Sequence, residues 1–345
     1  SEIIEGAMVL SDILGYLISE EGIIVQVVKI EKGHGVIISD EKITIEYSSL
    51  PGFFRSLTIV LYYISNGYGN LELHENEYFD TCGIMIDVSR GTVPKIETLK
   101  KLIMYMARMG LNMLMLYMED IYRINKYPYF GYMRGAYSKD EICETVEFAD
   151  KFGIEIVPSI QTLGHLSKTL RWKAHEKMRD TDNVLLIDED ATYDLIEEMI
   201  KTLRECFKTD RIHIGMDEAH GVGLGNFLLK HGYKNRYEIL LDHLNKVVFL
   251  CRKYSFKPMM WSDMFFRLGS ETNDYYDINA KMPANINELI PNGVSQVYWD
   301  YYHCSAEIYK SMIAAHKSMD CEVVFAGGIW TWTGFSAKYG QTMRS

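Results

Sequence analysis

The stretch Ile212-His-Ile-Gly-Met-Asp-Glu218 places two adjacent carboxylates directly after a short apolar run. The run predicts a buried strand that ends near Met216, and Gly221, Gly223 and Gly225 then predict a loop. Carboxylates that project from a strand end into loops are typical of the active-site face of barrel enzymes. Because adjacent like charges push their pKa values apart, one group of such a pair can hold charge while the other keeps a proton.

The pattern of strand, loop and helix recurs on both sides of this stretch, from about residue 80 onward. Helices are expected between the strands, and Ser138 with Glu141 forms a capping box at the start of one of them. Repeated units of this kind predict a parallel sheet, and this many in one run predict an α/β fold of the (β/α)8 TIM-barrel type. The expected strands are 84–89, 113–118, 154–160, 212–216, 258–261, 294–299 and 322–326, and the expected helices are about 96–109, 138–153, 165–178, 191–207, 236–254 and 305–318.

Seven strands are visible where a closed barrel has eight. Residues 327–345 are too few for a further helix, strand and helix, and an incomplete barrel leaves exposed sheet edges. We therefore expect the eighth strand to be truncated and the chain to be the first part of a longer protein.

The first 75 residues have a different pattern. Segments rich in β-branched residues at 23–30, 36–39 and 42–47 predict strands separated by turns, and 53–65 predicts a helix. The sequence thus predicts a small α+β N-terminal domain at 1–75 and a TIM-barrel catalytic domain, incomplete at its C-terminus, at 76–345.

Composition excludes several classes of partner. The chain has 36 basic and 47 acidic residues, a formal net charge of −11, and no Lys/Arg-rich run, so we expect no nucleic acid partner. None of the six cysteines forms a CxxC pair, so neither a zinc site nor a disulfide framework is expected. The sequence has no leader pattern and no long apolar segment, so we expect no membrane partner and a cytoplasmic location.

Every expected strand ends on charged, imidazole or aromatic residues. Carboxylates and guanidinium groups bind hydroxyls, and indole rings stack on the apolar faces of sugars, so this set predicts a carbohydrate pocket. Phosphate recognition would instead call for glycine amides and basic residues. The residues are Asp87, Arg90, Glu119, Asp120, His165, Asp217, Glu218, Trp261, Asp263, Trp299, Tyr301, Tyr302, Trp330 and Trp332.

On these motifs the chain resembles glycoside hydrolase family 20, the β-N-acetylhexosaminidases. The hallmark His-x-Gly-x-Asp-Glu stands at 213–218, and Asp87-x-x-Arg90, Gly164-His165, Trp261 and Trp299 match in order, as does Asn112 with Asp120 eight residues on. The resemblance covers roughly residues 80–335. Residues 1–75 resemble the small α+β domain that precedes the barrel in this family.

The resemblance implies an exo-acting retaining enzyme that removes terminal N-acetylglucosamine or N-acetylgalactosamine from glycans. In this family the substrate's own 2-acetamido oxygen attacks the anomeric carbon and forms an oxazolinium intermediate. Glu218 is implied as the general acid and later the base, and Asp217 as the group that orients the acetamide and stabilises its positive charge. Tyr301 is our candidate for the hydrogen bond to the acetamide oxygen, with Tyr302 nearby in the sequence.

Further residues are implied as substrate-binding groups. Arg90 would bind the outer hydroxyls and close the pocket, and His165 with Asp120 would form a supporting pair. The resemblance implies no cofactor and no metal, and a glycan with a terminal β-linked N-acetylhexosamine as the partner. The family usually adds a further Trp and a carboxylate on strand eight, which this chain does not reach. The sugar would be walled by Trp261, Trp299, Trp330 and Trp332.

Other interpretations remain open at this point. A barrel that binds N-acetylhexosamine without turnover shares these residues, and a metal-dependent hydrolase could use His213, Asp217, Glu218 and His220. His213 lies inside the expected strand, which favours a structural hydrogen-bonding role over that of a base. Residues 217–220 also spell a helicase-type DEAH box, but the chain has no Gly-Lys pair for a phosphate loop, so that interpretation is rejected.

Overall fold

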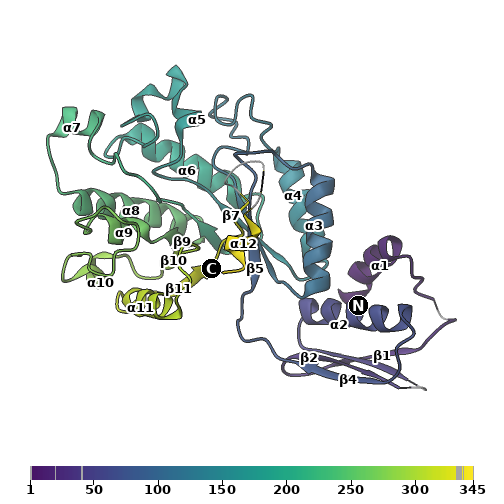
Figure 1. Ribbon diagram of the computed structural model, residues 1–345. Coiled ribbons are helices and arrows are strands. Elements are labelled where there is room, and N and C mark those ends of the chain that lie inside the picture. The colour runs from purple at the N-terminus through teal and green to yellow at the C-terminus, as the bar shows by residue number, and fades with distance from the viewer. Residues whose placement is uncertain (1, 20, 40–41, 332–335, 337, 345) are drawn as a thin grey trace. The chain divides into compact units, whose positions relative to one another are not determined.

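The computed structural model describes the chain except residues 1, 20, 40–41, 332–335, 337 and 345 (Figure 1). Two compact units are present. The first comprises Ser1–Tyr117, Tyr137–Val157 and Cys206–Lys208, and the second comprises Met118–Ala136, Pro158–Glu205 and Thr209–Ser345. The division at residue 76 that the sequence predicts stays a prediction.

A mixed four-stranded sheet forms near the N-terminus, in the order β1-β3-β2-β4. Strands β1 and β3 are parallel, whereas β2 runs antiparallel to β3 and β4. Helix α2 begins after Ser49, whose side chain accepts a hydrogen bond from the Gly52 amide, and it buries Phe53 and Phe54. The small α+β arrangement is therefore confirmed, and α1 is an additional helix. The elements are α1 Glu2–Leu14, β1 Val25–Lys29, β2 His34–Ile38, β3 Ile43–Tyr47, α2 Leu50–Ser65 and β4 Leu71–Glu75.

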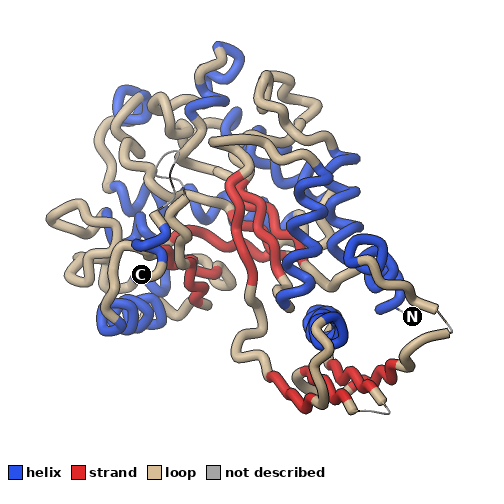
Figure 2. Tube along the Cα trace, turned by 45° about the vertical axis from the view of Figure 1, so that its right-hand side comes forward, coloured by secondary structure: helices blue, strands red, loops and turns tan. Residues whose placement is uncertain are grey.

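Seven strands form the second sheet, in the order β11-β10-β9-β8-β7-β6-β5. The strand pairs with a defined register are parallel, and Figure 2 shows the strands in red. This open half-barrel confirms the predicted α/β fold of TIM-barrel type with seven strands in the described part of the chain. The strands are β5 Gly83–Asp87, β6 Met113–Tyr117, β7 Glu155–Ser159, β8 Arg211–His213, β9 Lys257–Trp261, β10 Ser295–Trp299 and β11 Val323–Ala326.

Helices follow the strands as the capping signals predict. Helix α3 ends at Gly110, which adopts a left-handed φ of 76°, and α4 begins with the predicted capping box of Ser138 and Glu141. The single helix expected over 165–178 is instead two short pieces, α5 and the 3-10 helix η1. The helices are α3 Ile96–Met109, α4 Lys139–Asp150, α5 Ser167–Leu170, η1 Lys173–Met178, α6 Asp190–Arg204, α7 Asn226–His231, α8 Arg236–Lys253, α9 Asp263–Arg267, α10 Ile286–Leu289, α11 Ala306–Lys317 and α12 Tyr339–Thr342.

The cores consist of the apolar strand residues and the inner faces of the helices. Leu114 on β6, Val157 on β7 and Ile212 on β8 are fully buried, as expected for strands of a parallel sheet that are covered on both faces. Among the described helices, none combines the length and apolar character that crossing a membrane requires.

Candidate active site

The backbone after β8 adopts a strained path that sets the direction of Glu218. Gly215, Met216 and Glu218 have φ values of 73°, 73° and 49°, and the left-handed conformation costs a non-glycine residue roughly 1–2 kcal/mol. Two buried side chains hold this path. The Met216 amide donates to Gln161 Oε1 at 3.3 Å, and the Glu218 amide donates to Asp263 Oδ2 at 3.1 Å. The turn is the reason that β8 ends at His213, earlier than the predicted 216.

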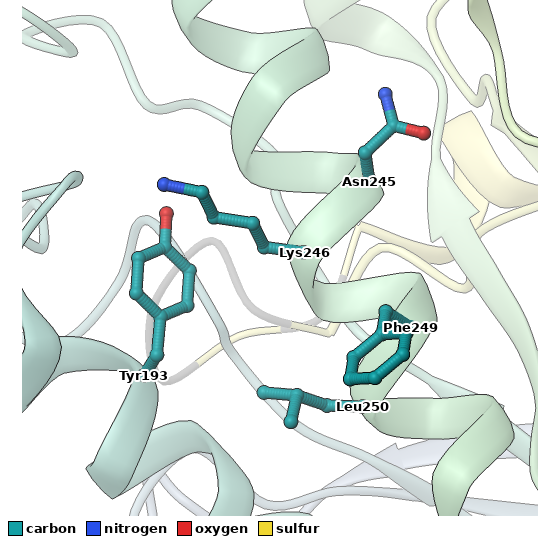
Figure 3. A pocket seen from close by; sticks show the side chains of 5 residues that line it. All are labelled: Tyr193, Asn245, Lys246, Phe249 and Leu250. Atoms are coloured by element: carbon teal, nitrogen blue, oxygen red, sulfur yellow. The ribbon is translucent and has the colours of Figure 1, made fainter.

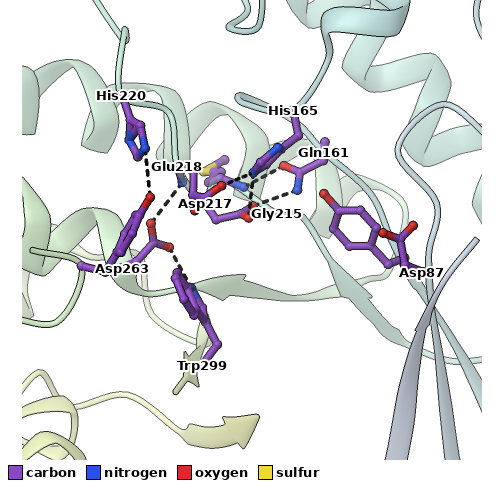
Figure 4. A network of polar contacts seen from close by, with 12 residues as sticks. Asp87, Gln161, His165, Gly215, Asp217, Glu218, His220, Asp263 and Trp299 are labelled. Carbon is purple, nitrogen blue, oxygen red and sulfur yellow. Dashed lines mark hydrogen bonds and ion pairs between the residues drawn. The ribbon is translucent and has the colours of Figure 1, made fainter. Parts of the chain in front are cut away.

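His165 brings the two carboxylates together (Figure 4). Its Nε2 lies 3.1 Å from Asp217 Oδ2 and 3.2 Å from Glu218 Oε2. The other Asp217 oxygen accepts a hydrogen bond of 2.8 Å from Gln161 Nε2. One imidazole nitrogen thus serves both carboxylates, and Asp217 is held at both of its oxygens.

The pKa values of both carboxyl groups are lowered, whereas the sequence argument expected one of the two to keep a proton. Burial acts to raise the pKa of Asp217, but its interactions with His165 and Gln161 outweigh burial and hold the pKa below its usual range. The interaction with His165 also lowers the pKa of Glu218, against burial, and a hydrogen bond with Tyr275 adds to the lowering. Both carboxylates are therefore charged near neutral pH in the free site, because His165 offsets their mutual repulsion.

Asp263 is a third carboxyl group at this site; the sequence places it among the strand-end residues of the predicted pocket but assigns it no individual role. It is fully buried, and it accepts hydrogen bonds from the Glu218 amide and, at 3.4 Å, from Trp299 Nε1. Burial and the charge of Asp217 raise the pKa of Asp263 to about 8. Near neutral pH Asp263 therefore carries a proton. The sequence argument instead placed a proton on one of the adjacent residues Asp217 and Glu218.

Tyr275 also belongs to the site and was missed. Burial and its hydrogen bond with Glu218 raise the pKa of the Tyr275 phenol, so the hydroxyl stays protonated as a donor. The hydroxyl lies 3.1 Å from His220 Nε2, and the ring centroid is 5.1 Å from that of Trp299. Tyr275 lies in a long loop after α9. It is distant in sequence from the end of any strand, so an inspection of the residues at strand ends does not find it.

Four of the predicted aromatic residues form one cluster, namely Trp299, Tyr301, Tyr302 and Trp330. Trp299 and Tyr301 stack with centroids 5.5 Å apart and an interplanar angle of 28°, and Trp330 Nε1 donates to the Tyr301 carbonyl at 2.8 Å. Burial raises the pKa of the Tyr301 phenol, and the charges of Glu218 and Asp217 contribute to the shift. Tyr301 is therefore a protonated donor within electrostatic reach of both carboxylates. Trp332 lies outside the described residues.

Trp261 and His213 pack beneath the site. Their ring centroids are 4.4 Å apart, and Trp261 is 8% exposed. His213 Nδ1 accepts the Gly215 amide at 3.1 Å, and burial lowers the pKa of His213 to about 4. His213 is therefore a neutral group that accepts a structural hydrogen bond, in agreement with the sequence interpretation of this residue. Among the described residues, the group of potential metal ligands at the site does not include His213, which weakens the metal-hydrolase interpretation.

Asp120 is a buried carboxylate, and its predicted pairing with His165 stays a prediction. Among the described residues it accepts from Arg134 Nε at 3.1 Å and from Thr169 Oγ1 at 3.2 Å, and it is 2% exposed. His165 lies against Asp217 and Glu218. The predicted role of Asp120 in binding substrate stays a prediction.

Arg90 follows β5 in the first unit. Its Nε lies 3.3 Å from Asp87 Oδ2, its Nη2 donates to the Tyr117 hydroxyl at 2.6 Å, and its guanidinium lies 4.7 Å from the centre of the Tyr117 ring. These contacts orient a half-exposed guanidinium. Its role in closing a sugar pocket stays a prediction.

The described part of the second unit has at least two hollows. One, of about 620 Å³, borders the site and is lined by Tyr275, Trp299 and Tyr302 among others. A second, of about 380 Å³ between α6 and α8, is shown in Figure 3. There Tyr193 binds His243 and Lys246 binds Asp188, so the hollow offers mainly apolar surface and none of the predicted site residues.

A parallel α/β half-barrel with carboxylates at the carboxyl end of β8 has the architecture of a TIM-barrel enzyme. The family described as glycosyl hydrolase family 20, catalytic domain, matches residues 79–298. The chain therefore belongs to glycoside hydrolase family 20.

Similar proteins agree with this membership. The chain is 27% identical to human Hexosaminidase D over 246 residues, which is 67% of this chain and 47% of the relative. It is 26% identical to bovine Hexosaminidase D over 226 residues, 61% of this chain and 60% of the relative. The chain thus spans about half the length of the curated relatives it matches.

Solved structures support the same fold. The family 20 exo-β-N-acetylglucosaminidase of Vibrio harveyi, in complex with N-acetylglucosamine, has a TM-score of 0.70 at 19% identity, covering 94% of this chain and 54% of that one. A β-N-acetylhexosaminidase from Bacteroides fragilis has a TM-score of 0.71 at 16% identity, covering 93% and 69%.

Proposed function

We propose that this chain carries the catalytic site of an exo-acting, retaining β-N-acetylhexosaminidase that works by substrate-assisted catalysis. The observation that carries the proposal is the joint attachment of Asp217 and Glu218 to His165 at the end of β8. Family membership supports the reaction class, and the N-acetylglucosamine in the Vibrio harveyi structure supports the sugar class.

Glu218 is the proposed general acid. As the substrate's acetamide oxygen bonds to the anomeric carbon, the bond to the leaving oxygen breaks and that oxygen takes the Glu218 proton. Water then attacks the anomeric carbon, the bond between that carbon and the acetamide oxygen breaks, and Glu218 takes a proton from the water. The side chain is 35% exposed, and burial already acts to raise its pKa, so a sugar that covers it favours the protonated form. A general acid of this kind contributes roughly 10²–10⁴-fold.

Asp217 is the proposed partner of the acetamide group. Its lowered pKa keeps it charged, and Gln161 fixes one of its oxygens. A fixed charge next to the acetamide nitrogen orients the group and stabilises the positive oxazolinium. The Tyr301 hydroxyl is the proposed donor to the acetamide oxygen, and Trp261, Trp299 and Trp330 are the proposed walls of the pocket.

Substitution of each carboxylate tests the proposal. With aryl N-acetylglucosaminides, Glu218→Gln is expected to lose turnover most strongly for poor leaving groups, which need protonation, and Asp217→Asn to slow all substrates. Glu97→Gln, the same change at an exposed side chain, is the control. Wild-type rates in both site variants would refute the assignment, and sugar binding without turnover by the wild-type protein would point to a binding barrel.

A further inference from the structure

His165, Asp217 and Glu218 form the one group of potential metal ligands that lie close together in the described part of the chain. The nearest ligand atoms of the three side chains all lie within 4.8 Å of one another. Both carboxylates approach the same imidazole nitrogen, Nε2 of His165, at 3.1 and 3.2 Å. A single point between these atoms is therefore close to all three.

Two other histidines with carboxylate neighbours differ in this respect. His74 contacts Glu46 through Nδ1 and Glu72 through Nε2, at 3.4 and 3.6 Å. His34 likewise contacts Glu75 and Glu77 through different nitrogens. In both clusters the two carboxylates lie on different edges of the imidazole ring, so they cannot share one ion with a single nitrogen.

The spacing at His165 fits Zn²⁺. Nitrogen and oxygen ligands bind Zn²⁺ at about 2.0–2.2 Å in tetrahedral geometry, which separates neighbouring ligand atoms by about 3.3 Å. The two distances from His165 already have this value. The two carboxylate oxygens lie within 4.8 Å of each other, and a rotation of the partly exposed Glu218 side chain can shorten that separation.

The surroundings match those of a three-ligand zinc site. Gln161 donates to the remaining oxygen of Asp217, as outer-shell groups do for carboxylate ligands. Glu218 is 35% exposed, so a fourth coordination position is open to water.

We propose that His165, Asp217 and Glu218 reversibly bind one Zn²⁺ ion and that the zinc-bound protein is inactive. Binding of the ion follows from the donor geometry, and it releases to water the Nε2 proton through which His165 contacts the two carboxylates. The inhibition rests on the proposed function, because zinc would occupy the Glu218 oxygen that must carry a proton and the Asp217 oxygen that must meet the acetamide. Zinc would thus act as an inhibitor that competes with the sugar, and catalysis itself would need no metal.

Calorimetric titration of the full metal-free chain with ZnCl₂, without substrate, tests the binding. We expect one site in the wild-type chain, and a loss of affinity of at least about 10-fold in His165→Gln and in Glu218→Gln, the scale at which even outer-shell changes act on metal sites. His74→Gln, the same substitution at an exposed histidine, is expected to bind as the wild type does. Mg²⁺ is expected to bind poorly because it prefers octahedral oxygen ligands. Undiminished zinc binding in both site variants, or no zinc binding by the wild-type chain, would overturn the proposal.

Kinetics test the consequence. We expect ZnCl₂ to raise the apparent KM of an aryl N-acetylglucosaminide without changing kcat, and excess EDTA to restore the rate fully. Zinc binding by a chain that never turns over the sugar would leave the metal site standing and defeat the proposed function. Turnover that zinc does not inhibit would defeat the inhibitory site and leave the proposed function standing.

Discussion

The substitution Asp263→Asn tests whether a neutral buried carboxyl group lies beside Asp217 and Glu218. Burial and the charge of Asp217 raise the pKa of Asp263 to about 8, whereas an aspartate in an unfolded chain has a pKa of about 3.9. Between these two pH values the folded protein keeps a proton that the unfolded chain has released. The stability that this group contributes is therefore fully present below the unfolded pKa and is lost as pH rises toward the folded pKa.

The size of the effect follows from this linkage. One bound proton changes the free energy of unfolding by about 1.4 kcal/mol per pH unit. Asparagine does not ionise, and its oxygen can still accept the Glu218 amide that Asp263 accepts at 3.1 Å. Across the interval from about pH 5 to pH 7, the variant should therefore gain stability relative to the wild type, by up to about 1.4 kcal/mol per pH unit.

Urea unfolding followed by tryptophan fluorescence measures the difference in unfolding free energy between the variant and the wild type in the unit that contains Asp263. The described tryptophans, Trp172, Trp261, Trp299 and Trp330, all lie in the second unit, which also holds Asp263. Asp182→Asn, at an exposed aspartate, controls for the loss of a carboxyl group. If the wild type and Asp263→Asn keep the same stability difference at every pH, Asp263 is an ordinary ionised carboxylate and the reasoning is wrong.

Three further predictions concern the same site. Tyr275→Phe removes a hydrogen bond that lowers the pKa of Glu218, so the fall of kcat/KM with rising pH should move to higher pH; an unchanged pH–rate profile would contradict this. Gly215→Ala should destabilise the second unit far more than Gly232→Ala in urea unfolding. Both residues have a φ of 73°, but a Cβ at 215 would lie 2.2 Å from a buried side-chain oxygen, whereas a Cβ at 232 would meet nothing within 4 Å. Equal losses of unfolding free energy in the two variants would contradict this. Arg90→Gln should raise KM roughly 10-fold with kcat nearly unchanged if Arg90 binds hydroxyls equally in the ground and transition states, and a fall in kcat alone would assign it another role.

The barrel could be predicted because its signals are local. Apolar strands, the capping box at Ser138 and the helix stop at Gly110 each depend on residues close in sequence, and each was found where expected. Helix α1 was not predicted because Gly6 interrupts its pattern. That glycine has a packing reason, since a Cβ there would lie 2.4 Å from the ring of Phe54.

The polar framework of the site could not be predicted because it joins distant segments. Asp217 and Glu218 were found from one motif, but Gln161, Asp263 and Tyr275 reach them from other loops. The prediction that one carboxyl of the adjacent pair keeps a proton was wrong for the same reason, because the pKa values of both groups are lowered. His165, 52 residues before Asp217 in the chain, neutralises the repulsion that the local sequence implies.

The participation of the substrate's own acetamide is the central claim of the proposed mechanism. The most direct measurement compares kcat for the nitrophenyl glycosides of N-acetylglucosamine and of its N-trifluoroacetyl analogue, whose amide oxygen is a much weaker nucleophile. We predict a steep fall in kcat for the fluorinated substrate. Equal kcat values for the two substrates would show that the amide oxygen does not attack the anomeric carbon, and would contradict the roles proposed for Asp217 and Glu218.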